Sequence, residues 1–271
     1  MTLSAVHPLA ALAPQPVDPG RWTAVIPAAG RGSRLGGNRA KLLHPVLGRP
    51  ILAWLADALR PTCGQFVFIL SPDNRAEVEP VLERLCGAPP RVAIQERPLG
   101  MADAVQRAED LVTTPSTLVV WGDQVTLKQS TIAACAWLHE QRAQPTLTLP
   151  SLWRRDPYIH LERDDRNRLT RVLQAREGEI HQPEGENDCG VFLFATATLF
   201  RTLRQARAAR AGLGSATGEF NLLQTLPRFE THPQAVATVR LDDPGETVGV
   251  NTPEDVLAAE AILRARAASI P

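Results

Sequence analysis

From Trp22 onward, short hydrophobic runs of β type alternate with stretches whose apolar residues recur at helical spacing. This alternation is typical of a parallel sheet with helices on both faces. The predicted strands are Thr23–Ile26, Phe66–Leu70, Val92–Gln95 and Leu118–Trp121. Two apolar stripes between them predict crossover helices, one formed by Ile51, Leu52, Leu55 and Leu59, the other by Val78, Val81, Leu82 and Leu85. We therefore expect a Rossmann-like, mostly parallel α/β fold.

The alternation of β-type runs and helical stretches is interrupted in the middle of the chain. Two β-type runs, Ile159–Arg163 and Leu169–Gln174, flank the polar turn Asp164–Asn167. A polar turn between two such runs predicts an antiparallel hairpin, which we expect to form a small inserted lobe within residues 151–187 on the acceptor side of the site. The elements expected after it are Gly190–Phe194, Leu199–Ala211, Val236–Val239 and a last helix capped by Thr252.

The composition fits one domain and gives no sign of a polymeric partner. The 271 residues are 44% hydrophobic, enough for the core of one large α/β domain, which we place at residues 21–271. Residues 1–20 are rich in Ala and Pro without a clear period and predict a mobile extension. Lys plus Arg and Asp plus Glu both number 29, so the charge favours neither nucleic acid nor a membrane surface as partner. The oligomeric state has no signal in the sequence.

The cysteines and the N-terminal segment predict a cytoplasmic protein. Four cysteines are scattered without a CxxC pair or neighbouring histidines, which argues against a zinc site and a disulfide framework. The first basic residue is Arg21, so the charged start of a secretory signal is missing. No apolar run is long enough to span a bilayer.

The most informative segment is Ala24–Leu43, in which a hydrophobic strand runs directly into a loop with glycines at positions 30, 32, 36 and 37. Such a loop can offer backbone N–H groups to phosphate oxygens, because glycine permits positive φ and close approach. Arg34 and Lys41 add positive charge. The spacing GxGxxxG matches neither the dinucleotide fingerprint nor the P-loop. Taken alone, the pattern fits a phosphate site and a structural turn with surface arginines about equally well.

The flanking residues favour the phosphate site. The stretch AAGRGSRLGGNRAKLL resembles the opening signature of the nucleotidyltransferase family that makes nucleotide sugars, in which a strand is followed by AAGxGTRM, a gap and PKxL. The resemblance implies the nucleotide-diphospho-sugar transferase fold, with Arg34 and Lys41 as catalytic residues that hold phosphates. Ala40 stands where the family has proline. The nucleotide is expected to lie against Ala28, Ala29, Gly30, Gly32 and Ser33.

Further segments match in the same order, most closely those of the uridylyltransferase half of the bifunctional enzyme that makes UDP-N-acetylglucosamine. QERPLGMADA at 95–104 resembles the segment in which Gln95 and the backbone of Gly100 read the uracil edge. An amide suits this role because it offers both a donor and an acceptor. VVWGD at 119–123 adds Gly122 to the nucleotide site. Without the resemblance, Gln95 reads as a surface glutamine in a loop.

The resemblance also implies a magnesium site. Asp123 follows a hydrophobic strand, at the end of the sheet where open α/β folds bind ligands. Asn251, in the VGVN segment, is the second implied ligand. Mg²⁺ prefers oxygen ligands and commonly bridges substrate phosphates. Without the resemblance, Asp123 reads as a helix cap.

The acceptor side departs from the family pattern. The residues that the resemblance assigns to the acceptor are Trp121, Gln174, Asp188, Gly190, Glu219 and Asn251. The family has Tyr, Glu and Asn where this chain has Trp121, Gln174 and Asp188. These changes redraw the hydrogen bonds offered to the acceptor, which favours a different acceptor. It could be another hexose 1-phosphate, an amino or deoxy sugar, or a cyclitol or other small phosphate; drift without a change of substrate is the alternative.

The implied reaction is in-line attack of an acceptor phosphate on the α-phosphorus of a nucleoside triphosphate, with pyrophosphate leaving. The Gln95 segment favours UTP, and Mg²⁺ is the expected cofactor. Two alternatives stay open: a cytidylyl- or guanylyltransferase that acts on a non-sugar phosphate or phosphonate, and a non-catalytic regulatory subunit that binds a nucleotide sugar. An NADP dehydrogenase is disfavoured, because Tyr158 is the lone tyrosine and no lysine lies near it.

Overall fold

One sheet organises the computed structural model, which describes residues 6–30, 32–35, 39–86 and 90–269. Within these residues it has nine strands in the order β1, β13, β8, β12, β7, β2, β5, β6, with β11 paired to β8. The bounds are β1 Val6–Pro8, β2 Trp22–Pro27, β5 Gln65–Leu70, β6 Arg91–Ile94, β7 Ser116–Val120, β8 Leu147–Arg155, β11 Glu184–Asp188, β12 Val191–Ala195 and β13 Val236–Arg240. Two further short strands, β3 Pro45–Val46 and β4 Arg49–Pro50, pair with each other.

The sheet is mostly parallel, as the sequence predicts. β2 pairs in parallel with β5 and β7, and β5 pairs in parallel with β6. β12 runs antiparallel to β7 and β8, whereas β13 is again parallel to β8. All four predicted strands of the first half are confirmed to within two residues. Because parallel strands end at the same edge, the loops that follow β6, β2 and β7 meet there.

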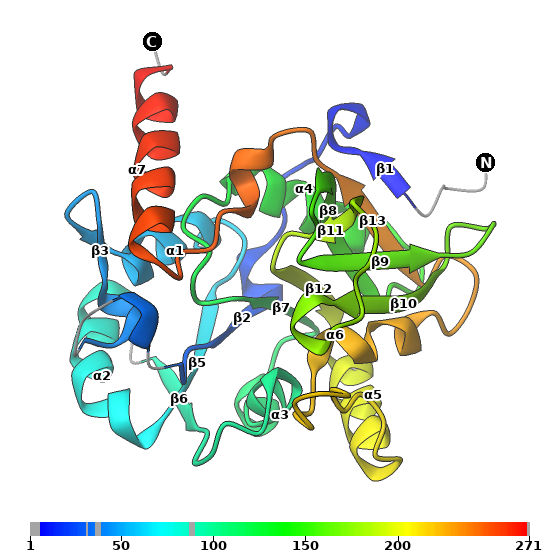
Figure 1. The fold of residues 1–271 in the computed structure, drawn as a ribbon, viewed down its shortest axis with the longest axis horizontal. Helices are drawn as coiled ribbons and strands as arrows, with labels where there is room; N and C mark the ends of the chain where they lie inside the picture. Colours follow the sequence, from blue (N-terminus) through cyan, green and yellow to red (C-terminus); the bar gives the residue numbers. More distant parts are fainter. Residues whose placement is uncertain (1–5, 31, 36–38, 87–89, 270–271) are drawn as a thin grey trace.

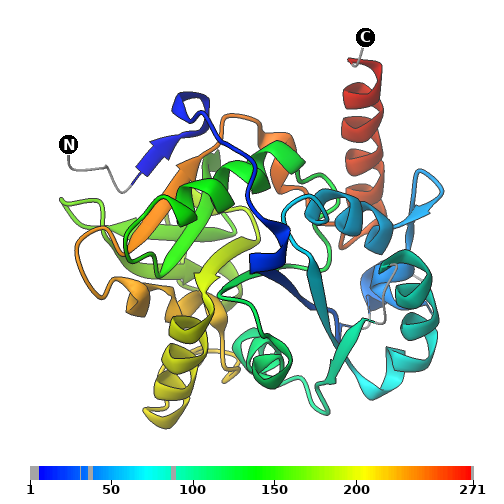
Figure 2. The same cartoon turned by 180° about the vertical axis from the view of Figure 1, so that it is seen from behind.

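Helices cover both faces of this sheet (Figure 1 and, from behind, Figure 2). Along β2, Ala24 and Ile26 join the hydrophobic cluster of α1, α2 and α4, while Val25 joins that of α3, α5 and α6. This alternation follows from the two-residue period of a strand, and it explains why all of β2 is buried. The helices are α1 Ile51–Leu59, α2 Pro72–Cys86, α3 Met101–Gln106, α4 Gln129–Glu140, α5 Thr196–Ala208, α6 Leu222–Thr225 and α7 Pro253–Ala268.

The C-terminal helix α7 begins with the predicted cap and extends away from the body of the molecule (Figure 1). The Thr252 hydroxyl accepts from the Asp255 N–H, and the Asp255 carboxylate accepts from the Thr252 N–H, which completes a capping box. None of the helices in the described part of the chain combines the length and the hydropathy of a membrane span.

The N-terminal segment differs from its prediction. Residues 1–20 were expected to lie outside the fold, but in the described part β1 pairs in parallel with the edge strand β13. Leu9, Leu12 and Val17 pack against the core, and Pro19 accepts a hydrogen bond from the Gly64 N–H. An open sheet edge can recruit a three-residue strand, and so short a strand leaves no period in the sequence.

The predicted hairpin is present as β9 Ile159–Arg163 and β10 Leu169–Gln174, which are antiparallel. The lobe is smaller than the range 151–187, however. β8 continues to Arg155 and pairs there with β11, so both ends of that range belong to the main sheet. β9 packs beside β11, and β10 packs against α6.

Candidate active site

A lysine, an aspartate and an asparagine meet where β7 and β2 end. The Lys41 ammonium donates to Asp123 Oδ2 and to Asn251 Oδ1, at 2.7 Å in both cases. The Asn251 amide in turn donates to Asp123 Oδ2 at 3.2 Å. The Arg34 guanidinium lies 3.4 Å from Asn251 Oδ1. The structure thus brings four sequence-predicted residues into one polar cluster, hereafter the Lys41 cluster.

Hydrogen bonds of the backbone fix the positions of Asp123 and Asn251, the two residues whose side-chain oxygens contact Lys41. The Val250 N–H donates to the Asp123 carbonyl at 3.0 Å, and an isolated bridge joins Gln124 to Gly249. The Asn251 N–H donates to Asp255, which is held by the capping box of α7. The start of α7 therefore positions the asparagine over the turn that carries the aspartate.

The loop that delivers Lys41 needs glycine at position 32. Gly32 has φ of +64°, and a Cβ there would lie 2.9 Å from the Lys41 Cβ. After this contact, Leu42 and Leu43 enter the core, so the backbone of the lysine is anchored while its side chain points into the site. Glycine is thus required by the close approach of two parts of the loop.

The other residues of the glycine loop are placed differently from one another. Ala28 is buried, its N–H donates to Ile69 and its carbonyl accepts from Asn74, so its backbone is used by the fold. Ala29 is half-buried, and Gly30 is exposed with open space around it. Ser33 begins a short helical turn. The glycines at 36 and 37 lie outside the described residues.

The two oxygens of the Lys41 cluster fit a magnesium ion. Asp123 Oδ2 and Asn251 Oδ1 converge on one point, which a cationic nitrogen already occupies. The other carboxylate oxygen, Asp123 Oδ1, is buried and has no hydrogen-bond partner among the described residues. Carboxylate and amide oxygens are suitable Mg²⁺ ligands. Since no group of three His, Cys, Asp or Glu side chains in the described chain could hold a metal, an ion here would take its other ligands from substrate and water.

Three of the predicted acceptor residues, Asp188, Gly190 and Trp121, contact one another. Asp188 is buried and accepts from the Gly190 N–H at 2.8 Å. Burial raises the pKa of Asp188 to about 6, and the charge of Asp123 acts in the same direction. Gly190 has φ of +69°, and a Cβ there would lie 2.7 Å from the Trp121 ring. The Trp121 N–H in turn donates to the Gly190 carbonyl at 3.0 Å, so these three predicted acceptor residues contact one another, and the charge of Asp123 acts on Asp188 among them.

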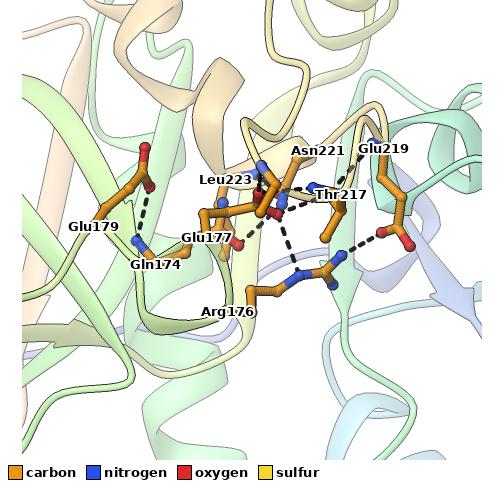
Figure 3. A network of polar contacts seen from close by, with 9 residues as sticks. Gln174, Arg176, Glu177, Glu179, Thr217, Glu219, Asn221 and Leu223 are labelled. Carbon is orange, nitrogen blue, oxygen red and sulfur yellow. Dashed lines mark hydrogen bonds and ion pairs between the residues drawn. The ribbon is translucent and has the colours of Figure 1, made fainter.

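Gln174 and Glu219 are engaged elsewhere. Gln174 is buried, its side-chain oxygen accepts from Asn221 at 2.9 Å, and its Nε2 has no partner among the described residues. Glu219 forms an ion pair with Arg176 at 2.5 Å (Figure 3). No hydrogen bond or ion pair of the described residues joins either side chain to the Lys41 cluster.

Nothing in the sequence pattern pointed to Glu177, which is the centre of the network in Figure 3. Its carboxylate accepts from the Ala216 N–H at 2.8 Å, the Thr217 N–H at 3.2 Å and the Thr217 hydroxyl at 2.8 Å. Burial alone raises the pKa of Glu177, but these hydrogen bonds and the Arg176 charge outweigh it and hold the pKa below its usual value. The network fastens the end of β10 to the loop before α6.

The predicted base-reading segment follows β6. The Gln95 amide nitrogen donates to the Gly100 carbonyl at 3.0 Å and to Asp103 at 2.9 Å. Gly100 has φ of +109°, and a Cβ there would lie 2.3 Å from the Phe220 carbonyl oxygen. The Phe220 N–H donates to Leu99, so the segment is also tied to the loop before α6. Asp103 carried no signal in the sequence beyond being an acid in a mostly apolar helix.

Comparison with known proteins identifies the family of this chain. The family model described as MobA-like NTP transferase domain matches residues 24–225. "Bifunctional protein GlmU" of Pelotomaculum thermopropionicum is 29% identical over 248 residues, which cover 90% of this chain and 52% of that protein. The protein of the same name from an Exiguobacterium species is 31% identical over 247 residues, covering 90% and 53%. The chain thus spans about half the length of these curated relatives.

A solved structure shares the fold. It is described as the inositol-1-phosphate CTP transferase from T. maritima, and it aligns with a TM-score of 0.65 at 19% identity. The alignment covers 89% of this chain and 95% of that one. At this identity the likeness concerns the fold alone.

Proposed function

The chain belongs to the family of MobA-like NTP transferase domains, and on this premise we propose that it joins the nucleoside monophosphate of UTP to a sugar 1-phosphate. It is a nucleotidyltransferase by family. The choice of UTP as the nucleotide and of a sugar 1-phosphate as the acceptor is our proposal. The observation that carries the proposal is the Lys41 cluster. Transfer of a nucleotidyl group between phosphates needs positive charge and oxygen ligands for a metal ion at the same place.

The reaction requires charge stabilisation more than acid or base chemistry. An oxygen of the acceptor phosphate forms a bond to the α-phosphorus, the bond from that phosphorus to the bridging oxygen breaks, and its electron pair leaves with pyrophosphate. Negative charge gathers on both sides of the phosphorus. Lys41 would stabilise the α-phosphate, and Arg34 the leaving pyrophosphate. Asp123 and Asn251 would hold Mg²⁺, whose charge neutralises and orients phosphates.

Two observations support UTP as the nucleotide. The relatives that align over 90% of the chain carry the name GlmU, and the Gln95 segment matches the uracil-reading segment of the uridylyltransferase that the sequence resembles. The structural neighbour is named for CTP and inositol 1-phosphate, at an identity that bears only on the fold. The sequence leaves open a cytidylyltransferase that acts on a non-sugar phosphate, and this is the competing candidate.

We propose an acceptor other than N-acetylglucosamine 1-phosphate. Asp188 replaces the family's asparagine, and the structure buries it beside Asp123. Trp121 replaces a tyrosine and packs on Phe192 with ring centroids 5.1 Å apart. Both changes alter the hydrogen bonds available to the acceptor next to the reacting phosphate.

The test is pyrophosphate release from four nucleoside triphosphates, each combined with hexose 1-phosphates, amino- and deoxyhexose 1-phosphates and inositol 1-phosphate. We expect turnover with UTP and a sugar phosphate, and its loss in Asp123→Asn. The matched control is Asp243→Asn, since Asp243 also lies 2.7 Å from a lysine ammonium, that of Lys128, outside the Lys41 cluster. Equal turnover in wild type and Asp123→Asn would remove the metal assignment, and turnover confined to CTP would replace the nucleotide.

A further inference from the structure

The orientation of the Gln95 amide is fixed by its partners. Its Nε2 donates to the Gly100 carbonyl and to Asp103 Oδ2. A carbonyl and an ionised carboxylate can only accept hydrogen bonds. A flipped amide would place its oxygen against both, with no hydrogen between them. The NH₂ group is therefore committed to the protein, and the oxygen is the group left for a ligand.

The oxygen of that amide is free for recognition. No hydrogen bond among the described residues ends on Gln95 Oε1, although the side chain as a whole is buried, with 6% exposed. The site therefore offers one acceptor at this position and no donor. A glutamine without such partners offers either group by rotating its amide.

Asp103 is held in its ionised form. Its side chain is almost fully buried, Arg207 donates to Oδ1 at 2.5 Å, and Arg107 lies 3.5 Å from Oδ2. Burial alone raises the pKa of Asp103, but the hydrogen bonds from Gln95 and Arg207 and the two arginine charges outweigh it and hold the pKa below its usual value. The Arg207 guanidinium also stacks over the Phe220 ring, which braces the pair against the Gly100 loop.

We propose that Asp103 is a positioning residue that sets the choice of nucleobase by locking the Gln95 amide with its oxygen toward the base. The inference rests on the proposed function, in which Gln95 meets the base edge. Among pyrimidines, uracil and thymine carry a hydrogen on N3 that can donate to this oxygen. Cytosine has a lone pair on N3, which would face the oxygen acceptor to acceptor. An acceptor placed opposite N3 thus favours a pyrimidine with N3–H over cytosine.

The expected discrimination is about 10- to 100-fold in kcat/KM, the effect of leaving one buried polar pair unmatched. The first test is Asp103→Asn, which keeps the size of the side chain but supplies an NH₂ group. The asparagine can donate to Gln95, which leaves the Gly100 carbonyl as the one partner of the two that still opposes rotation of the amide. We expect the ratio of kcat/KM for UTP over CTP to fall at least about tenfold, mainly through KM.

Two further variants separate positioning from a structural role. Arg207→Gln removes the closest ion pair of Asp103 but leaves the carboxylate that holds the amide, so the nucleotide ratio should stay as in wild type. Gln95→Leu should by itself lower the ratio of kcat/KM for UTP over CTP. In the double variant with Asp103→Asn, this ratio should equal that of Gln95→Leu alone. Thermal unfolding of each variant reports the fold. An unchanged ratio in Asp103→Asn, or an equal fall of the ratio in Arg207→Gln, overturns the inference.

The outcome can be read even if the proposed function fails. If wild type releases no pyrophosphate with any acceptor, that function is wrong, and calorimetric titration of the same variants with UTP and CTP decides the positioning role. Tighter binding of UTP by wild type, lost in Asp103→Asn, supports it. A wild type that prefers CTP in turnover or binding overturns the inference and leaves the nucleotidyltransferase assignment intact.

Discussion

The ammonium of Lys41 lies 2.7 Å from the carboxylate of Asp123, although 82 positions separate the two residues. The same ammonium is 2.7 Å from Asn251 Oδ1. It therefore occupies the point on which the two oxygens proposed as Mg²⁺ ligands converge. A divalent ion and this ammonium cannot share that point. The lysine must therefore move before an ion is held there, and phosphates of the nucleotide are the groups able to draw it away.

Replacing the lysine should expose the ion site. In Lys41→Met, without nucleotide, we expect Mn²⁺ to bind at least about tenfold more tightly than in wild type, because its oxygen ligands are no longer occupied. Electron paramagnetic resonance of free Mn²⁺ measures this without turnover. Arg34→Met removes the same charge nearby but not the occupant, and should give a smaller gain. Equal gains in both variants would show a general charge effect and contradict the prediction.

Gly100 should be intolerant of a side chain. In Gly100→Ala, the methyl group would lie 2.3 Å from the Phe220 carbonyl oxygen, and φ of +109° adds backbone strain. We expect a loss of more than about 2 kcal/mol in the free energy of unfolding, measured in urea. Gly48→Ala is the matched control, because Gly48 has φ of +73° with open space around it and should lose only about 1 kcal/mol. Similar losses in both would rule out the steric contact.

Glu177 should hold the hairpin lobe in place. Glu177→Gln replaces an acceptor-only group by one that must turn an NH₂ toward Thr217 or Ala216, and it leaves Arg176 with one partner fewer. We expect a loss of about 1–3 kcal/mol and faster proteolysis between residues 212 and 219. Glu219→Gln, which breaks a more exposed pair with the same arginine, should cost under about 1 kcal/mol. A variant at 177 as stable as wild type would contradict this role.

His139 should make the protein sensitive to acid. Burial, assisted by the Arg142 charge, lowers the pKa of His139 to about 3, from an ordinary value of 6.5. Between these values the unfolded chain binds a proton that the folded chain does not. The free energy of unfolding should therefore fall as pH falls from 6.5, by up to about 1.4 kcal/mol per pH unit from this group.

Urea unfolding of His139→Leu between pH 4 and 8 checks this. The variant loses the contact with the Thr148 hydroxyl at every pH, but its slope below pH 6.5 should be flatter than that of wild type. His181→Leu, at an exposed histidine, should keep the wild-type slope. Parallel slopes in wild type and His139→Leu would contradict the assignment.

Local patterns predicted the elements well, for physical reasons. The strand at Thr23–Ile26 and the cap at Thr252 depend on periodicity and hydrogen bonds within a few residues, and both are confirmed. The three-residue strand β1 could not be predicted, because its stability comes from the edge of β13, more than 200 positions away. Gln174 was predicted from its alignment with an acceptor residue, yet its orientation depends on Asn221, which lies on another segment.

The sequence by itself determined the class of fold, the family and the residue types available for phosphate chemistry, since these follow from periodicity and motifs in short windows. Only the tertiary structure decided which side chains face one another. Lys41 meets Asp123 because two parallel strands end at one edge. The Gln95 amide has one orientation because a helix brings Asp103 against it and another helix supplies Arg207. Such choices depend on partners far away in the chain, and no local pattern encodes them.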